Sequence, residues 1–194
     1  FAKKLENRII YNKIAVRIDP KQNLVYFQDG SKVKYNKLLS SIPLTKILSL
    51  LEDVPDDVLD SSRKLKSNKF LLVHIGIARP NLTNKSWIYF SDEDISFVRI
   101  SFPANMSRTT VPEGCSSIQV ELSYGPNNCL PSPLESIVPK VIHELTSLGI
   151  INNDEKILFT KTSSIENAYV IFDHERKSSI KTIHTFLESK NIIP

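Results

Sequence analysis

Apolar and polar residues alternate along the first forty positions of the chain in the manner of short β-strands. Alternating segments at residues 13–19 and 24–36 are separated by turn residues, Pro20 to Asn23, and the second segment contains the pair Asp29-Gly30. Alternation with a period of two indicates strands, and Asp-Gly supplies the positive φ that a tight turn requires. The pattern therefore predicts a meander of about three strands.

Two segments with the apolar spacing of helices follow. Residues 40–53 place three apolar side chains on one face, and Ser40 or Ser41 is expected to be the N-cap. Residues 54–66 begin with Pro55 and two aspartates, which the helix dipole favours in a first turn. The spacing predicts two more helices, which begin near Ser136 and His174 and end at Gly149 and Ser189.

The remaining apolar segments are of strand length. Residues 69–78 are almost continuously apolar, which favours a central strand buried on both faces. We expect neighbouring antiparallel strands at 69–78, 87–102 and 115–124, with a turn at residues 91–94, and two separate strands at 156–162 and 168–172. The expected fold class is α+β, with a mixed, mostly antiparallel sheet and flanking helices.

A single arginine interrupts the apolar strand predicted at residues 95–102. Alternation places Phe97 and Arg99 on the same face of that strand. A guanidinium can stack on a ring while it donates to phosphate or carboxylate, so this face is a candidate anion-binding wall. The alternative is an arginine that extends from an exposed face or pairs with the acidic turn at residues 92–94.

Composition narrows the class of protein. The 25 basic and 21 acidic residues are scattered, which argues against nucleic-acid binding. Two isolated cysteines and four dispersed histidines form no metal motif, and the five glycines form no GxGxxG or P-loop. No apolar run approaches the roughly 20 residues of a membrane span, and we find no signal-peptide pattern. We expect a soluble, cytoplasmic protein.

Three stretches carry a resemblance to a known family. Residues 15–44, AVRIDPKQNLVYFQDGSKVKYNKLLSSIPL, resemble a segment late in the FAD-binding domain of flavin amine-oxidase-like enzymes. Residues 87–103 are similar to a segment of UDP-galactopyranose mutases and their relatives in surface-polysaccharide pathways. There a Tyr-Thr pair and a Tyr-Thr-Arg triplet fall on residues 90–91 and 97–99, so the arginine is shared. Residues 168–189 are similar to a strand and helix of the same family.

The resemblance implies an FAD-dependent oxidoreductase or mutase that acts on a nucleotide sugar or another small anionic substrate. It leaves the mutase and oxidase or dehydrogenase branches open. Arg99 would contact the diphosphate without a structural partner of its own. The implied substrate-binding residues are Arg99, Phe97 and Tyr169, and the implied FAD-binding residues are Val16, Ile42 and Pro43.

The resemblance also implies a domain organisation. Residues 1–43 would end the FAD-binding domain, 44–167 would form a substrate-binding or cap domain, and 168–194 would return toward the FAD-binding domain. The family's glycine-rich FAD motif and its GRxG segment would lie outside this stretch. We therefore expect a central fragment that is inactive by itself and binds no FAD. The competing hypothesis is a non-catalytic mixed-sheet module that binds a protein partner or a saccharide.

Overall fold

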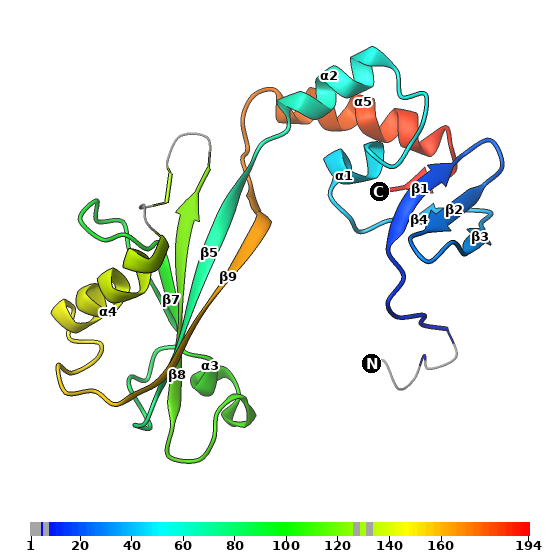
Figure 1. The fold of residues 1–194 in the computed structure, drawn as a ribbon. Helices are drawn as coiled ribbons and strands as arrows, with labels where there is room; N and C mark the ends of the chain where they lie inside the picture. Colours follow the sequence, from blue (N-terminus) through cyan, green and yellow to red (C-terminus); the bar gives the residue numbers. More distant parts are fainter. Residues whose placement is uncertain (1–4, 6–7, 126–128, 131–133) are drawn as a thin grey trace. The chain divides into compact units, whose positions relative to one another are not determined.

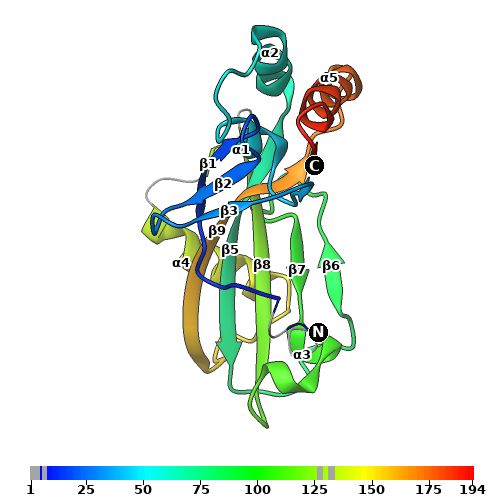
Figure 2. The same ribbon diagram turned by 90° about the vertical axis from the view of Figure 1, so that its right-hand side faces the viewer.

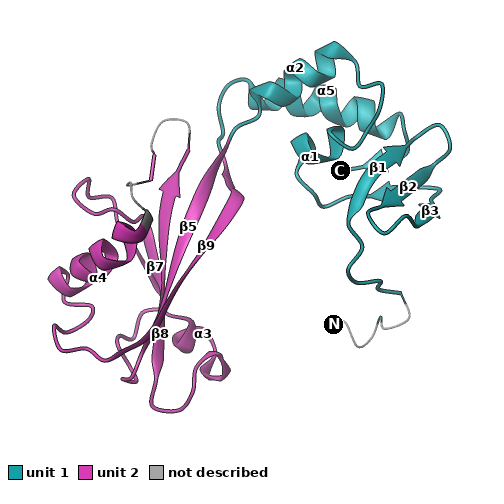
Figure 3. Ribbon diagram, viewed as in Figure 1, with its two compact units in different colours: residues 1–66, 171–194 teal, residues 67–170 magenta. Residues whose placement is uncertain are grey.

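The computed structural model describes residues 5, 8–125, 129–130 and 134–194, and it divides the chain into two compact units (Figure 3). Residues up to Lys66 fold together with residues 171–194, and residues 67–170 form the second unit. We call them the terminal unit and the central unit. Residues 44–66, which the resemblance assigned to a cap, lie in the terminal unit. The assignment of the units as FAD-binding and substrate domains stays a prediction.

The terminal unit combines the predicted meander with helices from both ends of the chain. Strands β1, β2 and β3 pair antiparallel in sequential order, which confirms the meander. A second, parallel pair joins β4 to β10, the last strand of the chain, and the sequence did not predict it. The elements are β1 (Ala15–Asp19), β2 (Leu24–Phe27), β3 (Lys32–Lys34), β4 (Leu38–Leu39), α1 (Leu44–Leu48), α2 (Asp56–Lys64), α5 (Arg176–Glu188) and β10 (Ile192–Ile193).

The predicted cap of α1 was wrong. The helix begins after Pro43, which has an extended conformation, and no side chain caps it. A proline disfavours helical conformation in the residue before it, so Ile42 cannot extend the helix toward Ser40 or Ser41. Ser40 instead accepts a hydrogen bond from the backbone N–H of Ile42 at 3.4 Å, two residues before the helix starts.

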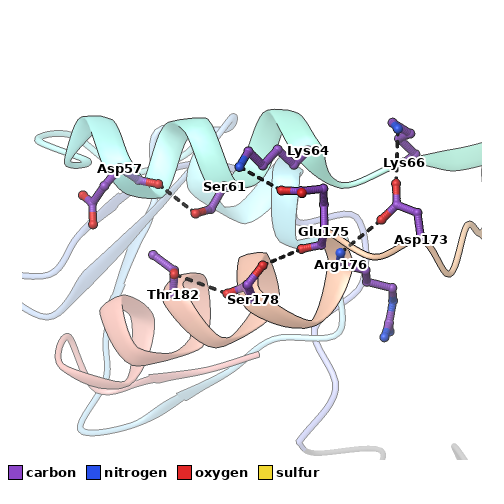
Figure 4. A network of polar contacts seen from close by, with 9 residues as sticks. All are labelled: Asp57, Ser61, Lys64, Lys66, Asp173, Glu175, Arg176, Ser178 and Thr182. Carbon is purple, nitrogen blue, oxygen red and sulfur yellow. Dashed lines mark hydrogen bonds and ion pairs between the residues drawn. The ribbon is translucent and has the colours of Figure 1, made fainter.

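Helices α2 and α5 pack together although they are far apart in sequence. Val58 of α2 joins Ile183 and Leu187 of α5 in one buried cluster of the terminal unit. Ion pairs join residues at or beside the helix ends, as Figure 4 shows: Lys64 to Glu175 at 2.9 Å and Lys66 to Asp173 at 3.2 Å. These ion pairs join the segment where the chain leaves the terminal unit, after Lys66, to the segment where it returns, at residue 171.

The central unit is a five-stranded antiparallel sheet with helix α4 on one face (Figures 1 and 2). The strand order is β6-β7-β8-β5-β9, so β5 is an interior strand, as predicted. Three apolar residues of α4 are buried against the sheet: Ile137, Val141 and Leu145. The elements are β5 (Ser67–Ile77), β6 (Trp87–Tyr89), β7 (Arg99–Ser101), α3 (Pro103–Met106), β8 (Ser116–Tyr124), α4 (Ile137–Ser147) and β9 (Ile157–Val170).

Three predictions for this sheet need correction. The strand predicted at 95–102 shortens to β7, because residues 95–98 leave the regular ladder after the turn. The separate strands predicted at 156–162 and 168–172 are instead the two ends of one 14-residue strand, β9, which covers Ile157–Val170 and leaves out residues 156, 171 and 172. Sequential order predicted the hairpin β6–β7 between β5 and β8; the hairpin does adjoin β8, but β5 pairs with β8 and not with the hairpin. The α+β class with mostly antiparallel sheets is confirmed.

Candidate functional site

Polar side chains gather on the face of the central sheet that is opposite α4. Residues paired directly across antiparallel strands point to the same face, so the register identifies the neighbours. One row is apolar and joins the core, with Ile100, Val120 and Val73 fully buried. Two rows beside it point to the opposite face. The first row consists of Tyr89, Arg99, Glu121, Leu72 and Ser163. The second row consists of Trp87, Ser101, Gln119, His74 and Lys161. We call these two rows the polar sheet face.

Arg99 is held on this face by a buried carboxylate. Its Nη2 donates to Oε1 of Glu121 at 2.6 Å, and its Nη1 donates to the hydroxyl of Tyr89 at 3.2 Å. The Glu121 side chain is 3% exposed, whereas that of Arg99 is 35% exposed. The hydrogen bond to Glu121 raises the pKa of Arg99 above its usual value, although burial opposes this. The pair fixes the guanidinium, and the pair as a whole carries no net charge.

The surroundings of the pair form a shallow pocket of about 360 Å³. Such a volume lies in the range of roughly 300–1,000 Å³ that is usual for small-molecule sites. Trp87 and Tyr89 are 53% and 66% exposed, so both rings offer apolar surface to a ligand. The Nε of Arg99 is buried and has no hydrogen-bond partner among the described residues. The lining residues are Trp87, Tyr89, Arg99, Ser101, Pro103, Met106 and Gln119. We call this the Arg99 pocket.

The structure answers the question that the sequence left open about Arg99. Its partners are Glu121 and Tyr89, and the acidic residues 92–94 are exposed without an ion pair to it. The expectation that Arg99 has no structural partner was therefore wrong. The sequence could not identify Glu121, because 21 residues separate the two positions before the ladder between β7 and β8 brings them together.

The alternation predicted that Phe97 shares a face with Arg99, and this prediction was wrong. The side chain of Phe97 is 2% exposed and belongs to the core of the central unit. The ring meets that of Phe90 edge to face, with centroids 5.0 Å apart. The regular ladder starts only at Arg99, so the period of two does not extend back to Phe97. Packing in the core is therefore sufficient to explain an aromatic residue at position 97.

The other predicted residues are not among those that line the Arg99 pocket. Tyr169 is 65% exposed near the end of β9, opposite Asn68 of β5 and outside the lining of the pocket. Val16, Ile42 and Pro43 belong to the terminal unit. The structure thus brings none of the predicted substrate residues beside Arg99, and their roles stay predictions.

The residues of this chain suit the apolar part of FAD better than its pyrophosphate. Val16 and Ile42 are 47% and 40% exposed and offer apolar surface to a cofactor. The pyrophosphate of FAD is usually held by a glycine-rich turn at a helix N-terminus, and the sequence contains no such turn. This chain could therefore provide part of a cofactor site and would need other residues to hold the pyrophosphate.

Several residues of the polar sheet face escaped the sequence analysis. Gln119 donates from Nε2 to Oε1 of Glu121 at 3.4 Å, so it supports the same carboxylate as Arg99. The available signal was the alternation of polar and apolar residues in SSIQVELSY, which puts Gln119 and Glu121 on one side of the strand.

The described residues were expected to hold no metal motif and no membrane span. They contain no group of three or more His, Cys, Asp or Glu side chains placed to hold a metal ion. No helix in the described parts of the chain has the length and apolar character that crossing a membrane requires.

No family model matches the sequence. A reduced UDP-galactopyranose mutase superposes with a TM-score of 0.89 at 21% identity, over 99% of this chain and 43% of the mutase. A putative protoporphyrinogen oxidase from Exiguobacterium sp. 255-15 gives a TM-score of 0.71 at 11% identity, over 98% of this chain and 44% of the other.

A putrescine oxidase with redesigned cofactor binding is also similar, with a TM-score of 0.67 at 10% identity, over 99% of this chain and 44% of the oxidase. This chain thus spans less than half the length of each of these proteins. The resemblance to amine-oxidase-like enzymes and mutases is confirmed at the level of the fold, because this chain folds like the matching 43% of a UDP-galactopyranose mutase.

Proposed function

We propose that this chain is the substrate-binding portion of an FAD-dependent oxidoreductase or UDP-galactopyranose mutase-like enzyme, and that the substrate is a nucleotide sugar or another small anionic molecule. The fold shared with a mutase and two oxidases supports the class. The observation that carries the proposal is the Arg99 pocket, in which a guanidinium fixed by Glu121 stands beside two exposed aromatic rings.

The pocket suits a ligand with both flat and anionic parts. Trp87 and Tyr89 can stack on a base or cover the apolar side of a sugar ring. The Arg99 side chain is 35% exposed, and the N–H groups of its guanidinium that Glu121 and Tyr89 do not occupy can donate to phosphate oxygens. Because Glu121 already neutralises the arginine, directional hydrogen bonds rather than net charge would select the ligand.

Bound FAD would supply the redox or transfer chemistry of the complete enzyme. The residues of this chain would bind and orient the substrate. Ser101 and Gln119 line the pocket and can hydrogen-bond to sugar hydroxyls. Tyr169, Val16, Ile42 and Pro43 keep the roles that the resemblance implies, and Phe97 would support β7 from the core.

A titration of the chain with UDP and with uridine tests the proposal. We expect UDP to bind at least tenfold more tightly than uridine, since only UDP reaches the guanidinium with a diphosphate. The double variant Arg99→Gln/Glu121→Gln removes both charges while it keeps polar groups of similar shape, so the preference for UDP should disappear. Calorimetry or NMR line shifts measure the affinities.

The ion pair of Arg79 and Glu155 provides a matched control. Arg79 is 35% exposed and Glu155 is 7% exposed, close to the values for Arg99 and Glu121. The variant Arg79→Gln/Glu155→Gln should retain the preference for UDP. Equal affinities of the wild-type chain for UDP and uridine would reject the Arg99 pocket as a diphosphate site.

Two finer parts of the proposal rest on the likeness to the mutase. A role in surface-polysaccharide synthesis and a cytoplasmic location would follow if the complete enzyme interconverts nucleotide sugars. The mutase and oxidoreductase branches differ in net redox change. An assay of the complete enzyme that follows consumption of an electron acceptor separates them, because a mutase isomerises its substrate without net oxidation.

A further inference from the structure

A second hollow lies on the polar sheet face, over β8, β5 and β9. Its volume is about 400 Å³, and it shares only Pro103 and Gln119 with the Arg99 pocket. The side chains used in the argument below are His74, Gln119, Phe159, Lys161 and Ser163. We call this hollow the Lys161 pocket.

An aromatic ring forms one wall of the Lys161 pocket. Phe159 lies directly over Gly76, which is its partner across the β5–β9 ladder. A Cβ at Gly76 would stand 2.3 Å from Cε1 of the ring, so only glycine lets the ring lie this close to the sheet. Phe159 nevertheless remains 54% exposed. A ring held against backbone with its other side open offers a flat apolar surface to a ligand.

The charge of the Lys161 pocket differs from that of the Arg99 pocket. Lys161 is exposed and makes no ion pair within the described parts of the chain. No carboxylate is among the residues that line the hollow. Arg99 is neutralised by Glu121, so Lys161 is the cation of the polar sheet face that retains its net charge. An anionic group is therefore favoured at the β9 side of the face.

Neutral hydrogen-bonding groups complete the hollow. Nε2 of His74 and the hydroxyl of Ser163 are 3.0 Å apart, which fixes both side chains. The amide nitrogen of Gln119 is directed to Glu121 at 3.4 Å, which leaves the amide oxygen of Gln119 to accept a hydrogen bond. A flat apolar wall, neutral donors and acceptors, and one unpaired cation together match a hydroxylated ring that carries an anionic group.

We propose that the Lys161 pocket binds a sugar that carries a carboxylate or phosphate, with its ring on Phe159 and its anionic group on Lys161. The inference does not rest on the function proposed for the Arg99 pocket, because the two hollows use different cations. It adds a separate site for the acidic sugar to the polar sheet face.

An NMR titration of the full chain with glucuronate, glucose and inorganic phosphate tests the proposal. Glucuronate should bind at least tenfold more tightly than glucose, because only glucuronate has the carboxylate. It should also bind more tightly than phosphate, which cannot use Phe159. The signals that shift should be those of residues 74–76, 117–119 and 159–163. Inorganic phosphate that binds as tightly as glucuronate would overturn the role of the sugar ring.

Two pairs of variants locate the effect. Lys161→Gln should abolish the preference for glucuronate over glucose, whereas Lys156→Gln, which removes an equivalent exposed charge, should not. Phe159→Ala should weaken both sugars, whereas Leu158→Ala, at an exposed apolar residue that does not line the hollow, should have no effect.

The variants also separate this proposal from that for the Arg99 pocket. Arg99→Gln/Glu121→Gln should leave glucuronate binding unchanged while it alters UDP binding. Absence of glucuronate binding at millimolar concentration, an unchanged preference in Lys161→Gln, or shifts centred on Arg99 would each overturn the Lys161 pocket.

Discussion

At the scale of the residue, the arginine at position 99 depends on a carboxylate that the sheet buries. Replacing Arg99 by Ala leaves the Glu121 side chain, 3% exposed, with the weak hydrogen bond from Gln119 as its one side-chain partner among the described residues. A buried charged acceptor that loses its main partner costs about 1–3 kcal/mol, so the free energy of unfolding should fall by that amount. Urea denaturation of wild type and Arg99→Ala measures the change.

A second substitution identifies the cause of that loss. Glu121→Gln in the Arg99→Ala background removes the unpaired charge, so the double variant should be more stable than Arg99→Ala alone. If Arg99→Ala unfolds at the same urea concentration as wild type, Glu121 does not depend on Arg99.

The pair of Arg79 and Glu155 makes a prediction about pH. Arg79 donates twice from Nε and once from Nη2 to the carboxylate, at 2.7 to 3.1 Å, and this holds the pKa of Glu155 below its usual value. A lowered folded pKa stabilises the protein above the unfolded pKa, about 4.3, and that contribution is lost as pH falls through the folded value. The stability difference between wild type and Glu155→Gln should therefore be constant near neutral pH and shrink below about pH 4. Urea midpoints at several pH values check this, and a difference that grows on acidification would contradict it.

Individual residues show what sequence could and could not predict. Alternation correctly put Arg99 on the face opposite Ile100, because that stretch is a regular ladder. It failed for Phe97, two residues earlier, because the ladder had not yet begun there. The partner Glu121 depends on the pairing of two strands distant in sequence, and a local pattern contains no register between strands.

At the scale of the element, β9 shows why two predicted strands became one. Its middle residues are polar and mostly exposed, which in sequence is typical of a loop between two strands. The strand lies at the edge of the sheet, so a partner on one side is sufficient and polar side chains face solvent. No Gly or Pro interrupts it, and this was the signal for continuity.

The end of α4 gives a prediction at the same scale. Gly149 follows the helix with φ of 69°, a left-handed conformation that glycine adopts without strain. Gly149→Ala should lower the free energy of unfolding by about 1 kcal/mol, because no atom lies close enough to a new Cβ to compensate. Gly149→Asn should lose less, since asparagine tolerates this conformation better. Chemical denaturation distinguishes the two variants, and equal losses would show that the backbone conformation is not the cause.

At the scale of the whole molecule, the chain is a continuous unit inserted into a discontinuous one. The sequence predicted most helices and strands, since their patterns are local. It did not predict that residues 44–66 join the terminal unit, because helices α2 and α5 come together only through packing between distant segments. The parallel pair β4–β10 was missed for the same reason, as each strand has only two residues.

The purified chain should be colourless. The fold resembles that of enzymes that use FAD, but none of the five glycines forms the turn that holds a pyrophosphate. Apolar contacts such as those of Val16 and Ile42 would not hold the charged part of FAD. Absorbance after incubation with excess FAD and gel filtration measures retention, and a yellow protein with stoichiometric flavin would contradict the expectation.

The two buried clusters predict independent responses to core substitutions. Val141, in α4, is fully buried in the cluster of the central unit, and Ile183, in α5, is fully buried in that of the terminal unit. Replacement of a buried Ile by Ala typically costs 2–5 kcal/mol, and that of the smaller Val costs somewhat less.

Val141→Ala should therefore accelerate hydrogen exchange in β5 and β8 and leave α2 and β1 protected. Ile183→Ala should have the converse effect, because each cluster contains residues of its own unit alone. Equal acceleration throughout the chain by either variant would mean that the units unfold as one cooperative structure, and the central unit could then not be studied apart from the rest.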